Sequence, residues 1–175
     1  MRKLALTITA FGLIAGLPLA AQAAPADDLK SFREHYMKRF PGIPLEEYKN
    51  GVYAINADAR SSWEAIEEFP PYEDELMKGE ELFNTPFANG KTYASCFKNG
   101  GKGIAQNYPY WDAKAQKVKT FEAELNECRT KNGEKPLGWK KGKIAQLSAY
   151  LKNTSRGKAI NVKVPNDPGA LAAYN

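Results

Sequence analysis

Proline and glycine residues interrupt this chain so often that the sequence favours short helices joined by ordered loops. The 175 residues include 11 prolines and 14 glycines, and 11% are aromatic. Between these breaks apolar residues recur at helical spacing, and no segment shows the alternation typical of a strand. The class predicted is mainly α, with helices at these places: from Asp27 to about Arg39, from Asp58 to Pro70-Pro71, from Glu73 to Pro86, Phe121 to Lys131, and Lys143 to Ser155.

Turn and cap residues refine these limits. Aspartates that precede an apolar run are typical N-caps, and proline at a first helical position favours a helix start. We expect Asp27 and Asp28 to cap the first helix and Asp58 the second. We further expect one helical turn over 45–49, a short extended piece over 51–55, a long loop over 87–120 and a helix start at Asp167-Pro168.

The N-terminus has the pattern of a secretory leader. Arg2 and Lys3 precede an uncharged apolar stretch from Leu4 to Leu19, and Ala21-Gln22-Ala23 matches an A-x-A cleavage site. We expect a signal peptide over residues 1–23, a mature chain that begins at Ala24, and a periplasmic location, in which two cysteines tend to pair. An uncleaved anchor helix is the alternative.

The charge balance excludes one class of partner. The leader holds two of the 25 basic residues and none of the 20 acidic ones, which leaves 23 basic against 20 acidic residues in the mature chain. These charges are well mixed along the sequence. Such a small excess does not indicate nucleic-acid binding, and no membrane span is expected after cleavage.

Three features in order match class I c-type cytochrome domains. Gly79 and Phe83 lie four residues apart on one face of a predicted helix, and the last long helix carries Tyr150. Between these helices, where such domains carry the haem attachment motif C-x-x-C-H, stands Tyr93-Ala94-Ser95-Cys96-Phe97. The fold predicted is therefore a class I cytochrome c-like domain with an N-terminal helical extension.

The altered motif argues against covalent haem. In C-x-x-C-H both thiols bond to the haem vinyl groups and the histidine ligates iron. Tyr93 and Phe97 can do neither, so only Cys96 is left of this degenerate motif. His35, the single histidine, belongs to the N-terminal extension and is interpreted as a surface or half-buried helix residue. We expect no catalytic residue, no metal ligand and no cofactor-binding residue in this chain.

Several longer stretches of the sequence match one family of c-type cytochromes. From about Trp63 onwards the sequence resembles the SoxA subunit of the SoxAX cytochrome. The matching stretches are Gly79–Gly90, Ser95–Gly101, Ile104–Pro109, Glu124–Arg129 and Gly133–Leu137.

This resemblance implies a function for the family. SoxA with its small haem partner SoxX is an L-cysteine S-thiosulfotransferase of periplasmic thiosulfate oxidation. It joins thiosulfate oxidatively to a cysteine of the carrier SoxYZ and passes electrons to haem c. Whether this chain is itself an enzyme is left open, because the family's catalytic haem belongs to a C-terminal domain that we expect to be missing here.

The resemblance also implies a division of the chain. We expect a signal peptide over 1–23, the N-terminal extension over 24–71, a haemless cytochrome c-like domain over 72–160, and a linker with the start of a missing C-terminal haem domain over 161–175. In haem-bearing relatives the cysteine that matches Cys128 is placed to ligate iron. Without haem it faces Cys96, so we expect a disulfide between Cys96 and Cys128, with two free thiols as the alternative.

Three functions remain open at this stage. The first is a structural and partner-binding domain of a SoxA-type subunit, with Tyr108, Tyr110 and Trp111 in space that haem fills in relatives. The second is an electron carrier with haem attached through Cys96 alone and an unusual ligand such as Cys128. The third is a periplasmic binding module on a cytochrome scaffold.

Overall fold

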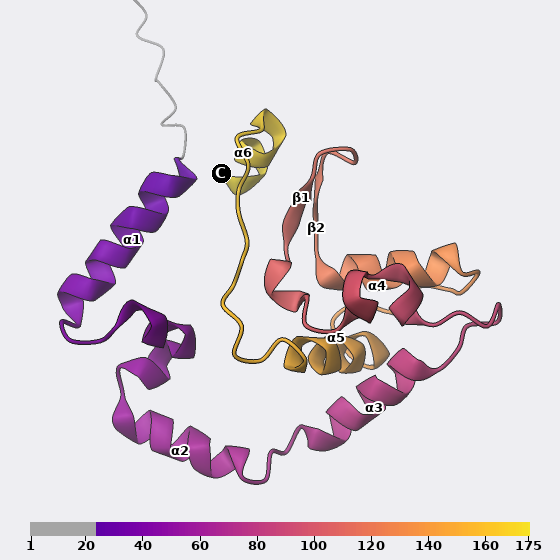
Figure 1. The fold of residues 1–175 in the computed structure, drawn as a ribbon, viewed down its shortest axis with the longest axis horizontal. Helices are drawn as coiled ribbons and strands as arrows, with labels where there is room; N and C mark the ends of the chain where they lie inside the picture. Colours follow the sequence, from indigo (N-terminus) through magenta and orange to yellow (C-terminus); the bar gives the residue numbers. More distant parts are fainter. Residues whose placement is uncertain (1–23) are drawn as a thin grey trace, which may run out of the picture.

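The computed structural model describes residues 24–175 (Figure 1), and the predicted leader with its cleavage site lies outside this range. The mainly α class expected from the sequence is confirmed. The elements are α1 (Pro25–Arg39), η1 (Leu45–Ala54), α2 (Ala57–Glu67), α3 (Glu73–Asn84), η2 (Tyr93–Cys96), η3 (Lys98–Gly101), η4 (Ala105–Asn107), β1 (Tyr110–Asp112), β2 (Lys117–Lys119), α4 (Phe121–Lys131), α5 (Lys143–Asn153) and α6 (Pro168–Tyr174), where η marks a 3-10 helix.

The core is built where α3 crosses α5, because a glycine lets the two helices approach closely. A Cβ on Gly79 would lie 2.2 Å from the carbonyl oxygen of Gln146 and 2.8 Å from Tyr150 Cβ. Next to this contact the rings of Phe83 and Tyr150 lie 5.8 Å apart. Helix α4 packs against α5. The buried side chains of this core are Phe83, Phe87, Tyr93, Phe121, Leu125, Cys128, Ile144, Leu147, Tyr150 and Leu151.

Two predicted caps are wrong, because each helix begins earlier in the sequence than expected. Helix α1 begins at Pro25, so Asp27 and Asp28 lie within its first turn, where their charge suits the helix dipole. Asn56 rather than Asp58 caps α2, and its side chain accepts a hydrogen bond from Ala59 N at 2.9 Å. The predicted cap at Asp167 is confirmed, with bonds from Gly169 N and Ala170 N.

Two loop segments differ from the sequence-based expectation. The piece over 51–55 is not extended, because η1 continues to Ala54 across a kink at Gly51, where φ is +59°. The loop over 87–120 contains the antiparallel hairpin β1–β2, in which Trp111 faces Val118. Three-residue strands are too short to show an alternating pattern, which is why the sequence did not indicate them.

Helices α1, η1 and α2 form an arm beside the part of the molecule that holds the core (Figure 1). No residue of α1, η1 or α2 is buried. Arg156, just after α5, attaches the arm, because it pairs with Glu67, donates to Tyr72 Oη and lies 5.8 Å from the Trp63 ring. At the other end of the arm, Tyr174 of α6 donates a hydrogen bond to Asp28 at 3.2 Å.

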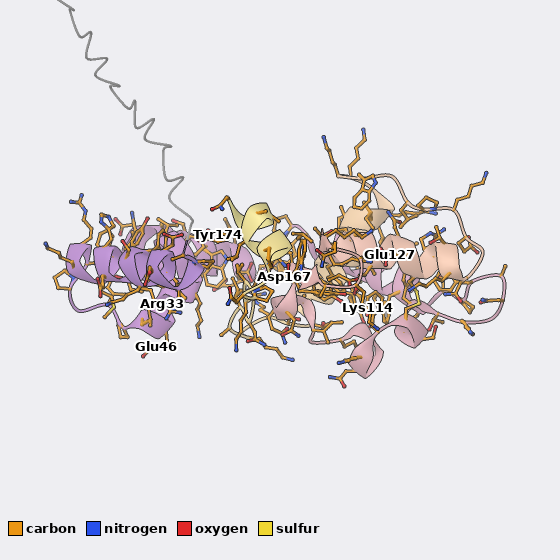
Figure 2. All side chains as sticks on the ribbon, turned by 90° about the horizontal axis from the view of Figure 1, so that it is seen from above. Arg33, Glu46, Lys114, Glu127, Asp167 and Tyr174 are labelled. Atoms are coloured by element: carbon orange, nitrogen blue, oxygen red, sulfur yellow. A yellow bond between two sulfur atoms is a disulfide. The ribbon has the colours of Figure 1, made fainter. Side chains whose placement is uncertain are left out.

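Figure 2 shows charged side chains over the whole length of the molecule. None of the helices between residues 24 and 175 combines the length and apolar character that a membrane span needs.

Candidate functional site

Tyr93, at the first cysteine position of the degenerate motif, is a core residue. Its side chain is 1% exposed, and its ring packs against Phe83 at 6.2 Å and Phe87 at 4.9 Å. Its hydroxyl accepts a hydrogen bond from Arg129 Nη1 at 3.2 Å. Burial raises the pKa of Tyr93, partly offset by this guanidinium. Tyr93 therefore fills the interior as a neutral phenol.

Phe97, at the histidine position, also packs on aromatic side chains. Its ring meets Phe121 edge-on at 5.7 Å, and Tyr108 stacks on the same Phe121 ring at 4.7 Å. Tyr108 is thus partly buried and packs against the core. The hairpin residues differ, because Tyr110 is 36% exposed and Trp111 packs against Gly169 of α6.

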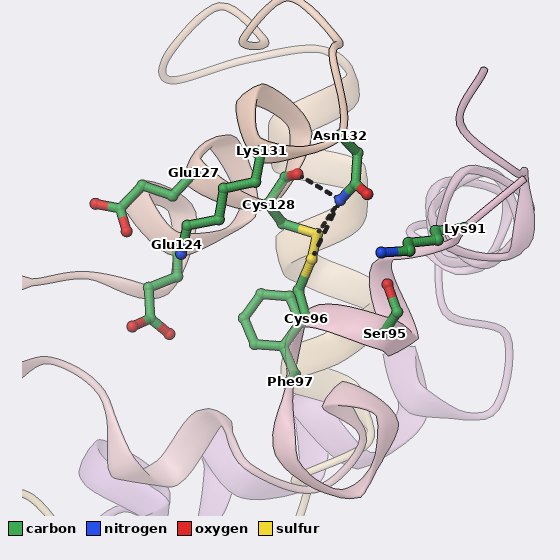
Figure 3. Close-up of a pocket in the computed structure, with 9 residues that line it drawn as sticks. All are labelled: Lys91, Ser95, Cys96, Phe97, Glu124, Glu127, Cys128, Lys131 and Asn132. Carbon is green, nitrogen blue, oxygen red and sulfur yellow. Dashed lines mark hydrogen bonds between the residues drawn. A yellow bond between two sulfur atoms is a disulfide. The ribbon is translucent and has the colours of Figure 1, made fainter. Parts of the chain in front are cut away.

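Cys96 and Cys128 form a disulfide, with their Cα atoms 5.8 Å apart, and this is the pair expected from the resemblance. The bond joins η2 to α4 (Figure 3). Asn132, at the end of α4, donates from Nδ2 to the Cys128 carbonyl at 2.8 Å and to Cys96 Sγ at 3.5 Å. The role of Asn132 was not predicted from the sequence, which indicated only a helix end there.

A pocket of about 310 Å³ opens over this disulfide. Figure 3 shows its lining side chains around the two sulfurs, and they come from η2, from α4 and from the loop before η2. The lining residues are Lys91, Ser95, Cys96, Phe97, Glu124, Glu127, Cys128, Lys131 and Asn132.

The residues present do not fit haem c. Both sulfurs are bonded to each other, so neither can form a thioether or ligate iron. Phe97 offers no ligand, and His35 lies exposed on α1, on the arm. The interpretation of Cys96 as a single attachment point is not supported by this geometry. Between residues 24 and 175 no cluster of histidine, cysteine and carboxylate side chains is placed to hold a metal ion.

Comparison with known proteins assigns the family. Residues 78–160 match the family model of the SoxA/TsdA cytochrome c domain. The L-cysteine S-thiosulfotransferase subunit SoxA of Chlorobaculum tepidum is 52% identical over 154 residues, which are 88% of this chain and 52% of that protein. The subunit of the same name from Allochromatium vinosum is 50% identical over 153 residues, or 87% of this chain and 54% of that protein.

The chain belongs to the SoxA family. It spans about half the length of the curated SoxA relatives that it matches. A solved structure gives the same family: the crystal structure of SoxXA from P. pantotrophus matches with a TM-score of 0.50 and 26% identity, over 60% of this chain and 40% of that one. The haem-incompatible motif at Tyr93, Cys96 and Phe97 therefore lies within the SoxA/TsdA cytochrome c domain.

Proposed function

We propose that this chain is the N-terminal, haemless part of a SoxA-type subunit of a periplasmic thiosulfate-oxidising system. The observation that supports this most directly is the identity of about half of all aligned residues with SoxA subunits over nearly the whole described chain. In this proposal the subunit acts with a SoxX-type cytochrome, joins thiosulfate oxidatively to a cysteine of a SoxYZ-type carrier, and passes electrons to haem c.

Within that subunit we assign the chain a structural and docking role. Joining thiosulfate to a thiol removes two electrons, so the reaction needs an electron acceptor. In residues 24–175 the donor set does not fit haem, and the Cys96–Cys128 disulfide is the one redox group. The proposal places the catalytic haem in the family's C-terminal domain, outside these 175 residues.

The periplasmic location rests on two observations. The leader pattern with Ala21-Gln22-Ala23 is typical of exported chains, and a disulfide forms and persists in oxidising compartments. A separate observation concerns the partner. The match to a crystal structure of SoxXA supports a SoxX-type partner for this chain.

Co-purification tests the docking role. The full chain is exported together with a tagged SoxX-type cytochrome, and the tag is used for capture from the periplasmic extract. We expect the mature chain to be retained, and an unrelated tagged c-type cytochrome of similar size to retain none. Equal retention by both cytochromes, or by neither, contradicts the docking role.

A turnover assay tests the assignment of the chemistry. Purified chain is mixed with thiosulfate, carrier and an electron acceptor, with and without the SoxX-type cytochrome. We expect no turnover above the buffer control from the chain alone. Repeated turnover by the isolated chain contradicts the assignment of catalysis to the C-terminal domain.

A further inference from the structure

The disulfide is open to solvent on one side only. Cys128 is 2% exposed on α4, whereas Cys96 on η2 is an exposed residue, and both line the pocket of about 310 Å³ (Figure 3). Thiol–disulfide exchange requires that a nucleophile reach one sulfur of the pair. Cys96 is therefore the sulfur open to attack, and Cys128 the leaving group.

Two lysines and two carboxylates line this opening. In Figure 3 Lys91 points toward the disulfide from one side, and Lys131 lies on the other side with its ammonium group turned away from the two sulfurs. Neither ammonium group makes an ion pair or a side-chain hydrogen bond with any described residue. Uncompensated positive charge beside a cleft raises the local concentration of small anions.

The two carboxylates that line the same pocket are engaged elsewhere. Glu127 pairs with Lys119 and lies 3.8 Å from Lys117 Nζ. Glu124 accepts hydrogen bonds from the hydroxyls of Tyr108 and Tyr110. The charge of Glu127 is thus balanced by lysines outside the pocket, whereas Glu124 keeps its charge because the two tyrosine hydroxyls are neutral. Two ammonium groups, those of Lys91 and Lys131, therefore line the pocket against one carboxylate that has no cationic partner.

Asn132 presents a hydrogen-bond donor to both sulfurs. Its Oδ1 accepts from Asn89 Nδ2 at 2.8 Å, which fixes the amide so that Nδ2 faces Cys96 Sγ at 3.5 Å and Cys128 Sγ at 3.8 Å. A donor to sulfur favours the thiolate over the thiol. Lys131, three residues after Cys128 on the same helix, also lines the pocket.

We propose that the Cys96–Cys128 disulfide is an exchange site for a small anionic sulfur nucleophile, of which sulfite is the simplest. Sulfite attacks Cys96 Sγ, a new S–S bond forms to give an S-sulfonate on Cys96, and the bond to Cys128 breaks. The electron pair of the broken bond leaves with Cys128 as thiolate. The sulfite sulfur is oxidised by two electrons and the disulfide is reduced, so the step needs no other oxidant, no haem and no partner.

Intact-mass analysis with site mapping tests the proposal. The purified mature chain is treated with sulfite under native conditions, and any free thiol is then alkylated. We expect one sulfite added to Cys96 and one alkyl group on Cys128. The same treatment in urea serves as the reference for full reactivity. No adduct in the native protein, or a sulfonate on Cys128, overturns the proposal.

Lysine variants test the role of charge. The variant Lys91→Gln/Lys131→Gln is compared with Lys114→Gln/Lys163→Gln, which removes the same charge at exposed positions outside the pocket. We expect the first to slow the sulfite reaction about tenfold at low ionic strength and the second to leave it unchanged. In about 1 M salt the difference should vanish.

A cationic thiol distinguishes two effects of the lysine variant: lost attraction of the anion, and a change in the local structure around the disulfide. Cysteamine carries an ammonium group, so the pocket lysines disfavour its approach, and its rate should stay equal or rise in Lys91→Gln/Lys131→Gln. Equal slowing of sulfite and cysteamine, or a sulfite rate that responds neither to the pocket lysines nor to salt, overturns the assignment of an anion-selective site.

Discussion

At the residue scale, Gly79 has no substitute in this packing. The helices α3 and α5 meet so closely there that an added Cβ lies within 3 Å of a backbone carbonyl, which cannot move without moving the helix. Interiors are packed to the density of organic crystals, so such a contact cannot be absorbed by empty space. The glycine thus sets the distance at which Phe83 and Tyr150 can pack.

Replacement of Gly79 by alanine tests this account. Although alanine favours the helical state, we expect Gly79→Ala to lower the free energy of unfolding by about 1–3 kcal/mol, because the methyl group overpacks the crossing. Gly138→Ala is the control, since nothing lies within 4 Å of a Cβ at Gly138. Urea denaturation measures both. An unchanged or higher stability of Gly79→Ala contradicts the proposed packing.

For the site residues, the sequence predicted their incompatibility with haem but did not predict their contacts. Tyr93 and Phe97 were recognisable as incompatible with haem, because the chemistry of C-x-x-C-H is specific to residue types. Their packing on Phe87 and Phe121, and the donor from Asn132 to the sulfurs, depend on loop geometry. Loop conformation leaves no periodic signal in a single sequence, so these contacts were not predictable.

At the element scale, a polar contact links α4 to α5 at the edge of the core. Glu122 of α4 accepts hydrogen bonds from Ser148 Oγ at 2.5 Å and Lys152 Nζ at 2.7 Å, both on α5. Burial alone would raise the pKa of Glu122, but these two donors hold it below its ordinary value of 4.5. A carboxyl with a lowered folded-state pKa stabilises the fold at neutral pH and loses that contribution on protonation.

The lowered folded-state pKa of Glu122 predicts how the stability of a Glu122 variant depends on pH. At pH 7 we expect Glu122→Gln to lower the free energy of unfolding by about 1–2 kcal/mol. As the pH falls below 4.5 towards the folded-state pKa, the difference from the unmodified protein should shrink. The matched control is Glu81→Gln, an exposed carboxylate on α3 with no side-chain partner in the described range. A difference that is constant with pH contradicts the ionic contribution.

Some elements were predictable from the sequence and others were not. Helices α3, α4 and α5 were predicted to within about two residues, because each has an apolar face at helical spacing and clear breaks at its ends. Of the kinked η1 only the turn over 45–49 was predicted, and the hairpin β1–β2 was missed. Both are set by single turns and by contacts with α2 and α6 rather than by a repeated pattern.

At the scale of the whole molecule, helix packing, aromatic rings and one disulfide hold this cytochrome c domain together. Helices α3, α4 and α5 make the core, in which Tyr93 is buried. The partly buried rings of Phe97 and Tyr108 pack against this core, and the disulfide joins the motif segment to α4. For a closed loop whose two cysteines have a sequence separation of 32, the chain-entropy estimate of the disulfide's contribution is about 3.5 kcal/mol. Cross-link and aromatic packing together hold the motif segment against the core, in an arrangement whose donor set does not fit haem c.

The intact mass of the exported protein tests this account most directly. The full chain is expressed with its leader in a host that contains an active cytochrome c maturation system, and the purified protein is analysed without reduction. The account predicts the mass of residues 24–175 less two hydrogens, and no Soret band in the visible spectrum. A mass increased by one haem, with the matching Soret absorbance, would contradict it.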